Sequence, residues 1–258
     1  IYDFLDRSKG KPFLLWYAPM MPHTPHNPPA RLLDKYSALP KEQARYYAMI
    51  EWFDETVGAL VKAIDERGLS NDTLFVYLAD NGWVQLPGNQ PLWATRAKMS
   101  PYDAGTRTPI FFRWKGRITP RRDDSTLASS IDIVPTVLAA LKLKSATPLP
   151  GLNLLDSKRA AARHEAFGAN FVHTSLDLYR PNANLKYRWI IHDHWKLIVP
   201  YAPNAKLPMW ERFDHTGWSA APQLYDLRAD PTEQRDLAAT EPARVNQLTR
   251  LLDRWWTP

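Results

Sequence analysis

Residues 71–82, Asn-Asp-Thr-Leu-Phe-Val-Tyr-Leu-Ala-Asp-Asn-Gly, carry the pattern from which the fold is predicted. The continuous apolar run 73–79 predicts a β-strand that is buried on both faces, as in a parallel sheet. Asp80, Asn81 and Gly82 follow this run directly. A carboxylate and a carboxamide at a strand end are hard oxygen ligands suited to Ca²⁺ or Mg²⁺, although the same three residues are also common in ordinary turns.

The stretches around this strand predict an α/β domain. Residues 12–18 and 109–114 are continuous apolar runs and are predicted as further buried strands. Apolar residues recur at three- and four-residue steps from about residue 42 to 67, which predicts a long helix that stops at Gly68. A second helix is predicted at 130–141. This alternation indicates a mostly parallel sheet flanked by helices, in which ligands bind at the carboxyl ends of the strands.

The pattern changes after the Pro-Leu-Pro-Gly sequence at 148–151. An antiparallel hairpin, one more short strand and an amphipathic helix are predicted beyond it, at 188–191 with 195–199, at 223–227 and at 242–256. We therefore expect residues 1–150 to be part of the α/β domain. Residues 151–258 are expected to form a small antiparallel α+β subdomain.

Composition narrows the function classes. The 258 residues include 33 Lys and Arg against 27 Asp and Glu, a net charge of +6, and the basic residues are scattered among acidic ones. We therefore expect no nucleic-acid partner, and an anionic substrate fits the charge equally well. No apolar run is long enough for a membrane span. Because cysteine is absent, disulfides, thiolate metal sites and a cysteine nucleophile are excluded.

Two further clusters contain residues suited to anion chemistry. His23 lies in Pro22-His23-Thr24-Pro25-His26, after the predicted strand at 12–18, and the prolines restrict its backbone. A histidine at a strand end is more often a hydrogen-bonded loop residue than a catalyst, but this imidazole is suited to donate to an anionic oxygen. Lys98 is suited to act as a point charge for an oxyanion. Arg107 is interpreted equally well as a structural ion-pair partner, of Asp103, or as a second cation for an anionic group.

In this order and spacing, the clusters resemble the sulfatase family, the formylglycine-dependent branch of the alkaline-phosphatase-like superfamily. The resemblance covers nearly the whole chain. It rests on the Pro-His-x-Pro pattern in 12–29, on Asp-Asn-Gly after a strand in 71–82, and on Lys followed by Tyr-Asp-x-Gly-x-Arg-x-Pro in 98–109. Three accompanying segments lie at 47–58, 131–136 and 224–233.

The resemblance implies an enzyme that hydrolyses a sulfate monoester of a small molecule or a carbohydrate. It implies that Asp80 and Asn81 are two ligands of an active-site divalent metal, usually Ca²⁺, with Mg²⁺ as the alternative. It also implies that Lys98 contacts the sulfate, and that His23 hydrogen-bonds the sulfate or the leaving-group oxygen as a catalytic residue. Family habit implies a periplasmic, extracellular or lysosomal location.

The chain departs from the family pattern in one major respect. The family nucleophile is a formylglycine made from Cys or Ser in a C/S-x-P-x-R motif, and this sequence contains no such motif. We therefore expect the chain to be the C-terminal part of a sulfatase, completed by a missing N-terminal half or by a partner segment. Met20 stands where many relatives have a further histidine, so the substrate side of the pocket is expected to be less polar.

Two alternatives stay open. A phosphonate monoester or phosphodiester hydrolase of the same superfamily shares the metal site and the Lys and His positions. A non-catalytic binding module with a sulfatase-like fold is the other. Six residues of loops and of the C-terminal subdomain are candidates for substrate choice, with packing or surface roles as the simpler interpretation: Trp83, Trp93, His173, Tyr179, Arg180 and His194.

Overall fold

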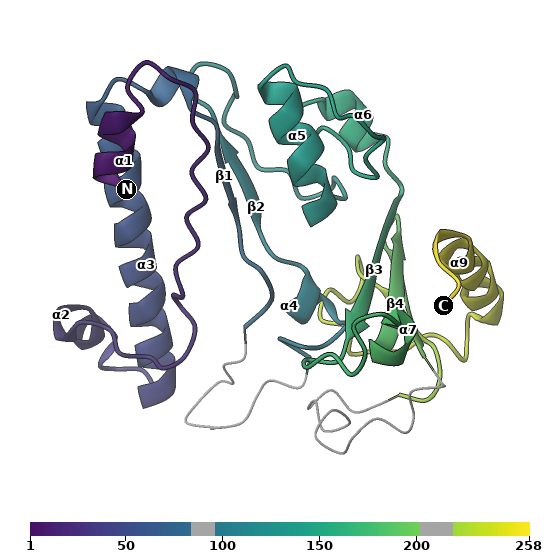
Figure 1. Ribbon diagram of the computed structural model, residues 1–258. Helices are drawn as coiled ribbons and strands as arrows, with labels where there is room; N and C mark the ends of the chain where they lie inside the picture. Colours follow the sequence, from purple (N-terminus) through teal and green to yellow (C-terminus); the bar gives the residue numbers. More distant parts are fainter. Residues whose placement is uncertain (84–95, 202–218) are drawn as a thin grey trace. The chain divides into compact units, whose positions relative to one another are not determined.

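The computed structural model describes residues 1–83, 96–201 and 219–258 (Figure 1). The described residues form two compact units. The first unit comprises residues 1–73 and 114–118, and the second comprises the described parts of 74–113 and 119–258. The stretch 74–83, with Asp80 and Asn81, therefore belongs to the same unit as residues 119–258.

The first unit is helical. Its elements are α1 (Tyr2–Arg7), α2 (Ala30–Leu33), the 3₁₀ turn η1 (Asp34–Tyr36), α3 (Lys41–Glu66) and the 3₁₀ turn η2 (Ser70–Asp72). The long helix predicted from the apolar periodicity is confirmed as α3. Gly68, just beyond its end, has a φ of 71°, which glycine adopts without steric cost. None of the helices in the described part of the chain is long and apolar enough to cross a membrane.

The prediction of a strand at 12–18 is wrong. These residues have no regular structure, and no strand among the described residues pairs with them. Two of their apolar side chains, Leu14 and Trp16, are 77% and 82% exposed. An apolar run becomes a buried strand only when neighbouring strands satisfy its backbone and cover its side chains, and the described residues supply neither.

The strands predicted at 73–79 and 109–114 are confirmed as β1 (Phe75–Leu78) and β2 (Ile110–Arg113). They form a two-stranded sheet and pair antiparallel, with Leu78 opposite Ile110. The expected parallel direction is therefore wrong for this pair, because an apolar run does not encode strand direction. As a consequence, the end of β1 and the start of β2 lie at the same edge. The expected burial on both faces is also wrong, since no residue of either strand is buried and Phe111 is 61% exposed.

The rest of the second unit contains a four-stranded antiparallel sheet. Its helices and turns are α4 (Asp103–Thr106), η3 (Ser130–Asp132), α5 (Ile133–Ala140), α6 (Ser157–Ala161), α7 (Pro181–Asn184) and α9 (Pro242–Trp255). The strand order is β3-β4-β5-β6, with bounds Glu165–Phe171, Leu185–His192, Trp195–Pro200 and Gln223–Asp226.

The predicted hairpin, short strand and terminal helix are confirmed as β4 with β5, β6 and α9. The sequence analysis missed β3. The helix α9 lies beside the sheet (Figure 1) and closes a core with residues of β4, β5 and β6. This core consists of Ile190, Leu197, Leu224, Leu248 and Leu252, each no more than 2% exposed.

The helix predicted at 130–141 is confirmed as η3 followed by α5, and Asp132 is the N-cap residue of α5. Ser129 and Asp132 form a reciprocal capping box. Arg163 also binds the buried Asp132 carboxylate in a bidentate pair, at 2.6 and 2.7 Å. This geometry makes Asp132 a structural anchor rather than a free acid.

A buried ion cluster joins α4 to the antiparallel sheet. Lys196 of β5 is 0% exposed, and its Nζ donates to Asp103 Oδ1 at 2.7 Å and lies 3.0 Å from Glu233 Oε1. Glu233 Oε2 accepts the backbone N–H of Asp103 at 2.6 Å. Arg107 Nη1 lies 3.7 Å from Asp103 Oδ2, which confirms the predicted ion pair. One ammonium thus holds two buried carboxylates at the first residue of α4.

Replacing Lys196→Met should lower the free energy of unfolding by about 3–5 kcal/mol, because two buried carboxylates lose their counter-ion. Urea denaturation followed by circular dichroism measures this change. The matched control is Lys62→Met. Lys62 has a side chain that is 75% exposed and, among the described residues, pairs with Glu66 alone, so its loss should cost no more than about 0.5 kcal/mol. Equal costs for the two variants would contradict the structural role of the buried cluster.

Glu233 should also make stability depend on pH. Burial raises the pKa of the Glu233 carboxyl above its ordinary value, despite the attraction of Lys196. The folded state therefore holds this proton more tightly than the unfolded state, and the resulting stability is lost as pH rises through the folded pKa. The free energy of unfolding of the wild type, minus that of Glu233→Gln, should fall as pH rises above the ordinary pKa of a glutamate, about 4.3. A difference that stays constant or grows with pH would refute the assignment.

Candidate active site

Asp80 and Asn81 lie in the turn that follows β1, one residue beyond its end. Asp80 Oδ1 accepts the backbone N–H of Asn81 at 2.9 Å, and Asn81 Nδ2 donates to Gly82 O at 3.0 Å. Among the described residues, Asp80 Oδ2 and Asn81 Oδ1 have no hydrogen-bond partner. The Asp80 carboxylate is exposed and Asn81 is half-buried. Two adjacent oxygen donors are thus available to a ligand.

Close backbone contacts bring the Asp80 and Lys98 segments together. The N–H of Gly82 donates to Gly105 O at 2.9 Å, and the N–H of Lys98 donates to Trp83 O at 2.9 Å. A Cβ on Gly82 would lie 1.7 Å from Ala104 O, so only glycine permits this approach. The half-buried Lys98 is therefore anchored, through its backbone, to the turn that holds Asp80 and Asn81.

A second close approach explains Gly105. A Cβ at this position would lie 2.2 Å from Ala97 O, next to Lys98. Tyr102 attaches the same segment to the antiparallel sheet, because its hydroxyl donates to Gln223 Oε1 at 2.8 Å and its ring packs against Tyr225. The Arg96 guanidinium carbon lies 4.5 Å from the Tyr102 ring centroid, a cation–π contact. The segment 98–109, which carries part of the family resemblance, is therefore held in place by close main-chain contacts.

Sequence reasoning missed the residues that support this element. Lys196, Glu233 and Arg96 were not singled out for this role, although Lys196 stands inside the apolar run 195–199. A charged residue in a continuous apolar stretch is a signal for a buried, paired ion. That signal points to Lys196, but it does not identify partners that are far away in the sequence.

The oxygen donors fit a divalent cation but do not complete its coordination. Ca²⁺ takes about six to eight oxygen ligands, and this turn contributes one carboxylate and one carboxamide. Within the described ranges, no group of three or more His, Cys, Asp or Glu side chains is arranged to hold a metal ion. Asp80 and Asn81 are suited to be part of a metal site whose remaining ligands come from elsewhere.

His23 belongs to the first unit. The His23 side chain is exposed, and its Nδ1–H donates to Thr24 O at 2.8 Å. This bond occupies Nδ1 and leaves Nε2 available to an external group. The neighbouring His26 differs, because burial lowers its pKa and its ring contacts Tyr46. The approach of His23 to Asp80 and Lys98, which lie in the other unit, stays a prediction.

The six candidates for substrate choice occupy different environments. Trp83 is 48% exposed, while His194 is half-buried beside Trp195, with its Nε2 4.0 Å from Asp226. His173 is exposed. Trp93 lies outside the described residues. The remaining two, Tyr179 and Arg180, lie in a structured loop that is considered below.

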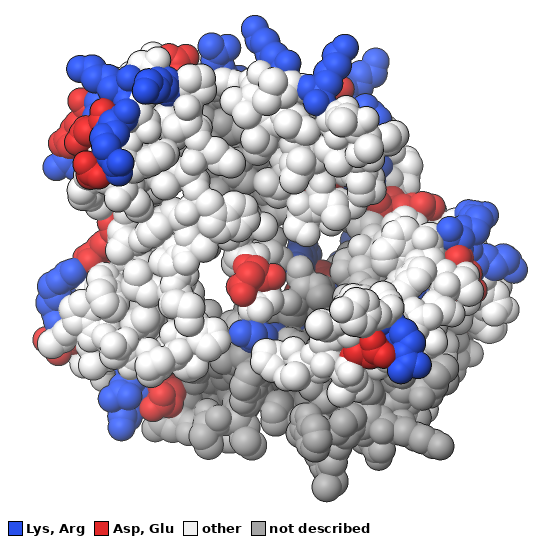
Figure 2. Space-filling model, viewed as in Figure 1, with Lys and Arg blue, Asp and Glu red and all other residues white. Residues whose placement is uncertain are grey.

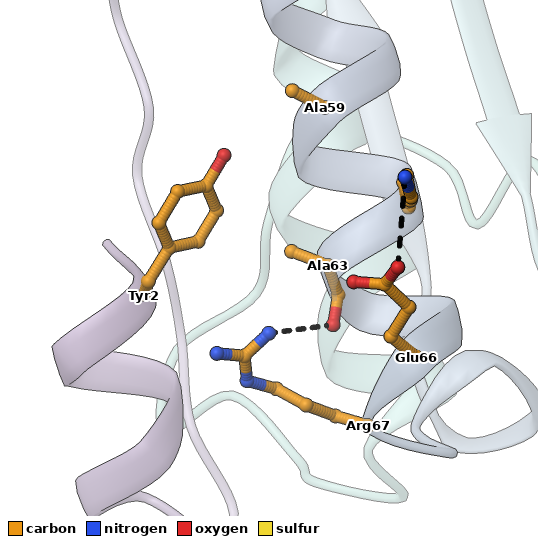
Figure 3. A pocket seen from close by; sticks show the side chains of 6 residues that line it. Tyr2, Ala59, Ala63, Glu66 and Arg67 are labelled. Carbon is orange, nitrogen blue, oxygen red and sulfur yellow. Dashed lines mark hydrogen bonds and ion pairs between the residues drawn. The ribbon is translucent and has the colours of Figure 1, made fainter.

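A hollow in the first unit is not part of this site. Its wall consists of Tyr2, Ala59, Lys62, Ala63, Glu66 and Arg67, from α1 and the end of α3 (Figure 3). The charged groups in it are paired with each other or with the backbone: Arg67 donates to Ala63 O at 3.0 Å and to Asp6 at 2.8 Å. Charged pairs also occur widely on the surface, where basic and acidic side chains lie next to each other (Figure 2).

Comparison with known proteins identifies the family. The family model described as Sulfatase matches residues 1–143. An N-acetylgalactosamine-6-O-sulfatase of Bacteroides thetaiotaomicron is 29% identical over 263 residues, covering 97% of this chain and 48% of that protein. The chain therefore spans about half the length of this relative.

Comparison with solved structures agrees with this family match. One from work on the metabolism of glycosaminoglycans by Bacteroides thetaiotaomicron has a TM-score of 0.73 and 26% identity, covering 98% of this chain and 52% of that one. The phosphonate monoester hydrolase SpPMH from Silicibacter pomeroyi has a TM-score of 0.59 and 23% identity, covering 82% and 40%, which shows the fold alone. These likenesses confirm the expected α/β fold class, the alkaline-phosphatase-like fold. With its ordered motifs, its family match and its fold in agreement, the chain belongs to the sulfatase family.

Proposed function

We propose that the protein containing this chain hydrolyses a sulfate monoester, and that Asp80, Asn81, Lys98 and His23 are this chain's part of the active site. The observation that supports the proposal most directly is the turn after β1. It offers two oxygen donors without partners among the described residues and is bonded to the backbone of Lys98. An anion-binding ammonium beside a hard-cation site is the combination that sulfate ester cleavage needs.

Asp80 and Asn81 would contribute two ligands to a bound divalent cation, for which Ca²⁺ is our first choice and Mg²⁺ the alternative. When bound, the cation and the family's formylglycine supply a Lewis acid and a nucleophile. The Asp80 carboxylate provides negative charge and the Asn81 amide a neutral oxygen. The rigid Gly82–Gly105 contact holds both donors in place before any ligand arrives.

Lys98 would neutralise charge on the nonbridging sulfate oxygens. Its backbone is fixed through Trp83, so little ordering of the main chain is needed when the anion binds. His23 would hold a proton on Nε2 and donate it to the departing alcohol oxygen. The carbonyl of Thr24 supports this role, because it keeps Nδ1 protonated and orients the ring.

The remainder of the site would come from the rest of the fold, either an N-terminal half or a partner segment. Two observations support this part of the proposal. The relative described above is about twice as long as this chain, and the apolar side chains of Leu14 and Trp16 lie exposed. A location outside the cytoplasm, in the periplasm, the extracellular space or the lysosome, is proposed from family habit. The proposed substrate is a small-molecule or carbohydrate sulfate ester, in keeping with the name of the Bacteroides relative.

The second candidate function is phosphonate monoester or phosphodiester hydrolysis, which the fold of SpPMH favours. Sulfate and phosphoryl groups are both tetrahedral anions, so Asp80, Asn81 and Lys98 serve either reaction. Turnover of aryl sulfate compared with aryl phosphonate and phosphodiester substrates separates the two. A protein that binds these anions but turns over none of them would be the non-catalytic module.

Lys98→Ala, His23→Ala and Asp80→Asn should each lower kcat/KM for a chromogenic aryl sulfate by about 100-fold or more, because each removes charge or proton stabilisation at the transition state. Steady-state kinetics of the intact protein with added Ca²⁺ measure the loss. Lys144→Ala and Asp72→Asn are matched controls at exposed positions and should retain activity. Unchanged turnover in all three site variants would defeat the proposal. A loss confined to Asp80→Asn would keep the metal role and reject those of Lys98 and His23.

Metal removal gives a separate prediction. Chelation should abolish turnover, and titration with Ca²⁺ should restore it. Asp80→Asn should need at least about tenfold more Ca²⁺ for half-maximal activity, because a charged ligand has been replaced by a neutral one. A parallel Mg²⁺ titration identifies the preferred cation. An identical Ca²⁺ requirement in the wild type and in Asp80→Asn would exclude Asp80 as a ligand.

A further inference from the structure

The loop formed by residues 173–180, between β3 and α7, is organised by one buried side chain. Asn184 is 7% exposed, and its Oδ1 accepts the backbone N–H of Leu176 at 2.5 Å and that of Asp177 at 3.1 Å. Its Nδ2 donates to Asp177 O at 2.6 Å and to Arg180 O at 3.3 Å. A single amide thus closes the 173–180 loop from inside.

Asp177 fixes the outer half of the 173–180 loop. Its Oδ1 accepts the backbone N–H groups of Tyr179 and Arg180, at 2.9 and 3.2 Å. Its Oδ2 accepts the Nε–H of Arg180 at 2.6 Å. These donors lower the pKa of the Asp177 carboxyl. The arrangement holds the guanidinium by Nε and leaves Nη1 and Nη2 without a hydrogen bond to any described residue.

This ordered loop places large side chains in the solvent. Tyr179 is 94% exposed, Leu178 is 83% exposed, and the Arg180 side chain is 79% exposed. An exposed aromatic ring on a pre-ordered backbone loses little conformational entropy when a ligand covers it. A planar ring beside a guanidinium with two free donor nitrogens matches a sugar ring that carries a sulfate group.

The loop begins at the same end of the sheet as the Lys98 segment. Asn170, near the end of β3, donates from Nδ2 to Ser100 O at 3.1 Å, and Ser100 is two residues from Lys98. The N–H of Val172 donates to Asn184 O at 2.8 Å, which joins the start of the loop to α7. Figure 1 shows α4 and α7 at the same ends of β3 and β4. The loop therefore begins close to the proposed sulfate contact.

We propose that Tyr179 and Arg180 form a binding subsite for a second, sulfated sugar unit of an oligosaccharide substrate. Tyr179 stacks on the sugar ring, and Nη1 and Nη2 of Arg180 bind its sulfate. The inference deepens the proposed function and rests on it for the identity of the substrate class. The binding itself does not require catalysis and is measured without it.

The test uses isothermal titration calorimetry of the protein in its natural length with chondroitin 6-sulfate and heparan sulfate tetrasaccharides. Wild-type protein should bind at least one of them saturably, and Tyr179→Ala should raise its Kd about 5- to 10-fold through loss of ring stacking. Arg180→Gln should raise the Kd for the sulfated tetrasaccharide by a similar factor but leave that for its desulfated form unchanged. Both side chains are exposed, so neither change should affect folding.

Matched controls are Tyr2→Ala and Arg7→Gln. Tyr2 is 54% exposed, and Arg7 pairs with Asp3 at 2.8 Å as Arg180 pairs with Asp177. Neither control should alter the Kd.

Equal Kd values for the wild type and both loop variants, or no saturable binding of either tetrasaccharide, would overturn the subsite. Failure of the proposed function looks different. In that case no aryl sulfate is turned over, while the difference in tetrasaccharide affinity between the wild type and the loop variants persists.

Discussion

The ion cluster of Lys196, Asp103 and Glu233 is the interaction on which the candidate site depends. Burying an ammonium and two carboxylates is costly, and it is tolerated only where the charges are paired at short range. The pairing occurs at the first residue of α4, so the same contact that compensates the buried charges also fixes the segment 103–107. Tyr102 reinforces it by packing into the sheet core. The four-stranded antiparallel sheet therefore supports the candidate site through α4.

Backbone contacts connect α4 to the two segments that carry Asp80 and Lys98. The carbonyl of Gly105 accepts the N–H of Gly82, and the Cα of Gly105 packs against the carbonyl of Ala97 with no space for a Cβ. The backbone of Gly105 therefore holds both the turn with Asp80 and the segment with Lys98. Neither glycine has a chemical role. Their contribution is to let three main-chain segments approach more closely than any side chain allows. This explains why the sulfatase-like pattern around 98–109 mixes charged residues with glycine.

The same sheet also presents the 173–180 loop. β3 contacts the Lys98 segment through Asn170 and continues into the loop that Asn184 and Asp177 hold. One sheet thus supports the proposed sulfate contact and the proposed second subsite from a common base. Substitution of exposed residues in the 173–180 loop would alter substrate recognition without disturbing the ion cluster. Such a division between a rigid scaffold and exposed recognition residues is common where binding residues lie on loops.

The local sequence pattern was sufficient to predict most of the helices and strands and to identify the candidate site residues. The apolar periodicity of α3, the runs that became β1, β2, β4 and β5, the capped start of α5 and the Asp80-Asn81 turn all depend on neighbours in the sequence, so the sequence alone determined them. Strand direction, the unpaired state of 12–18, the edge strand β3 and the partners of Lys196 were decided only by tertiary structure. The reason is that pairing and burial depend on residues far away in the chain, such as Asp103 and Glu233, whose approach no local pattern encodes.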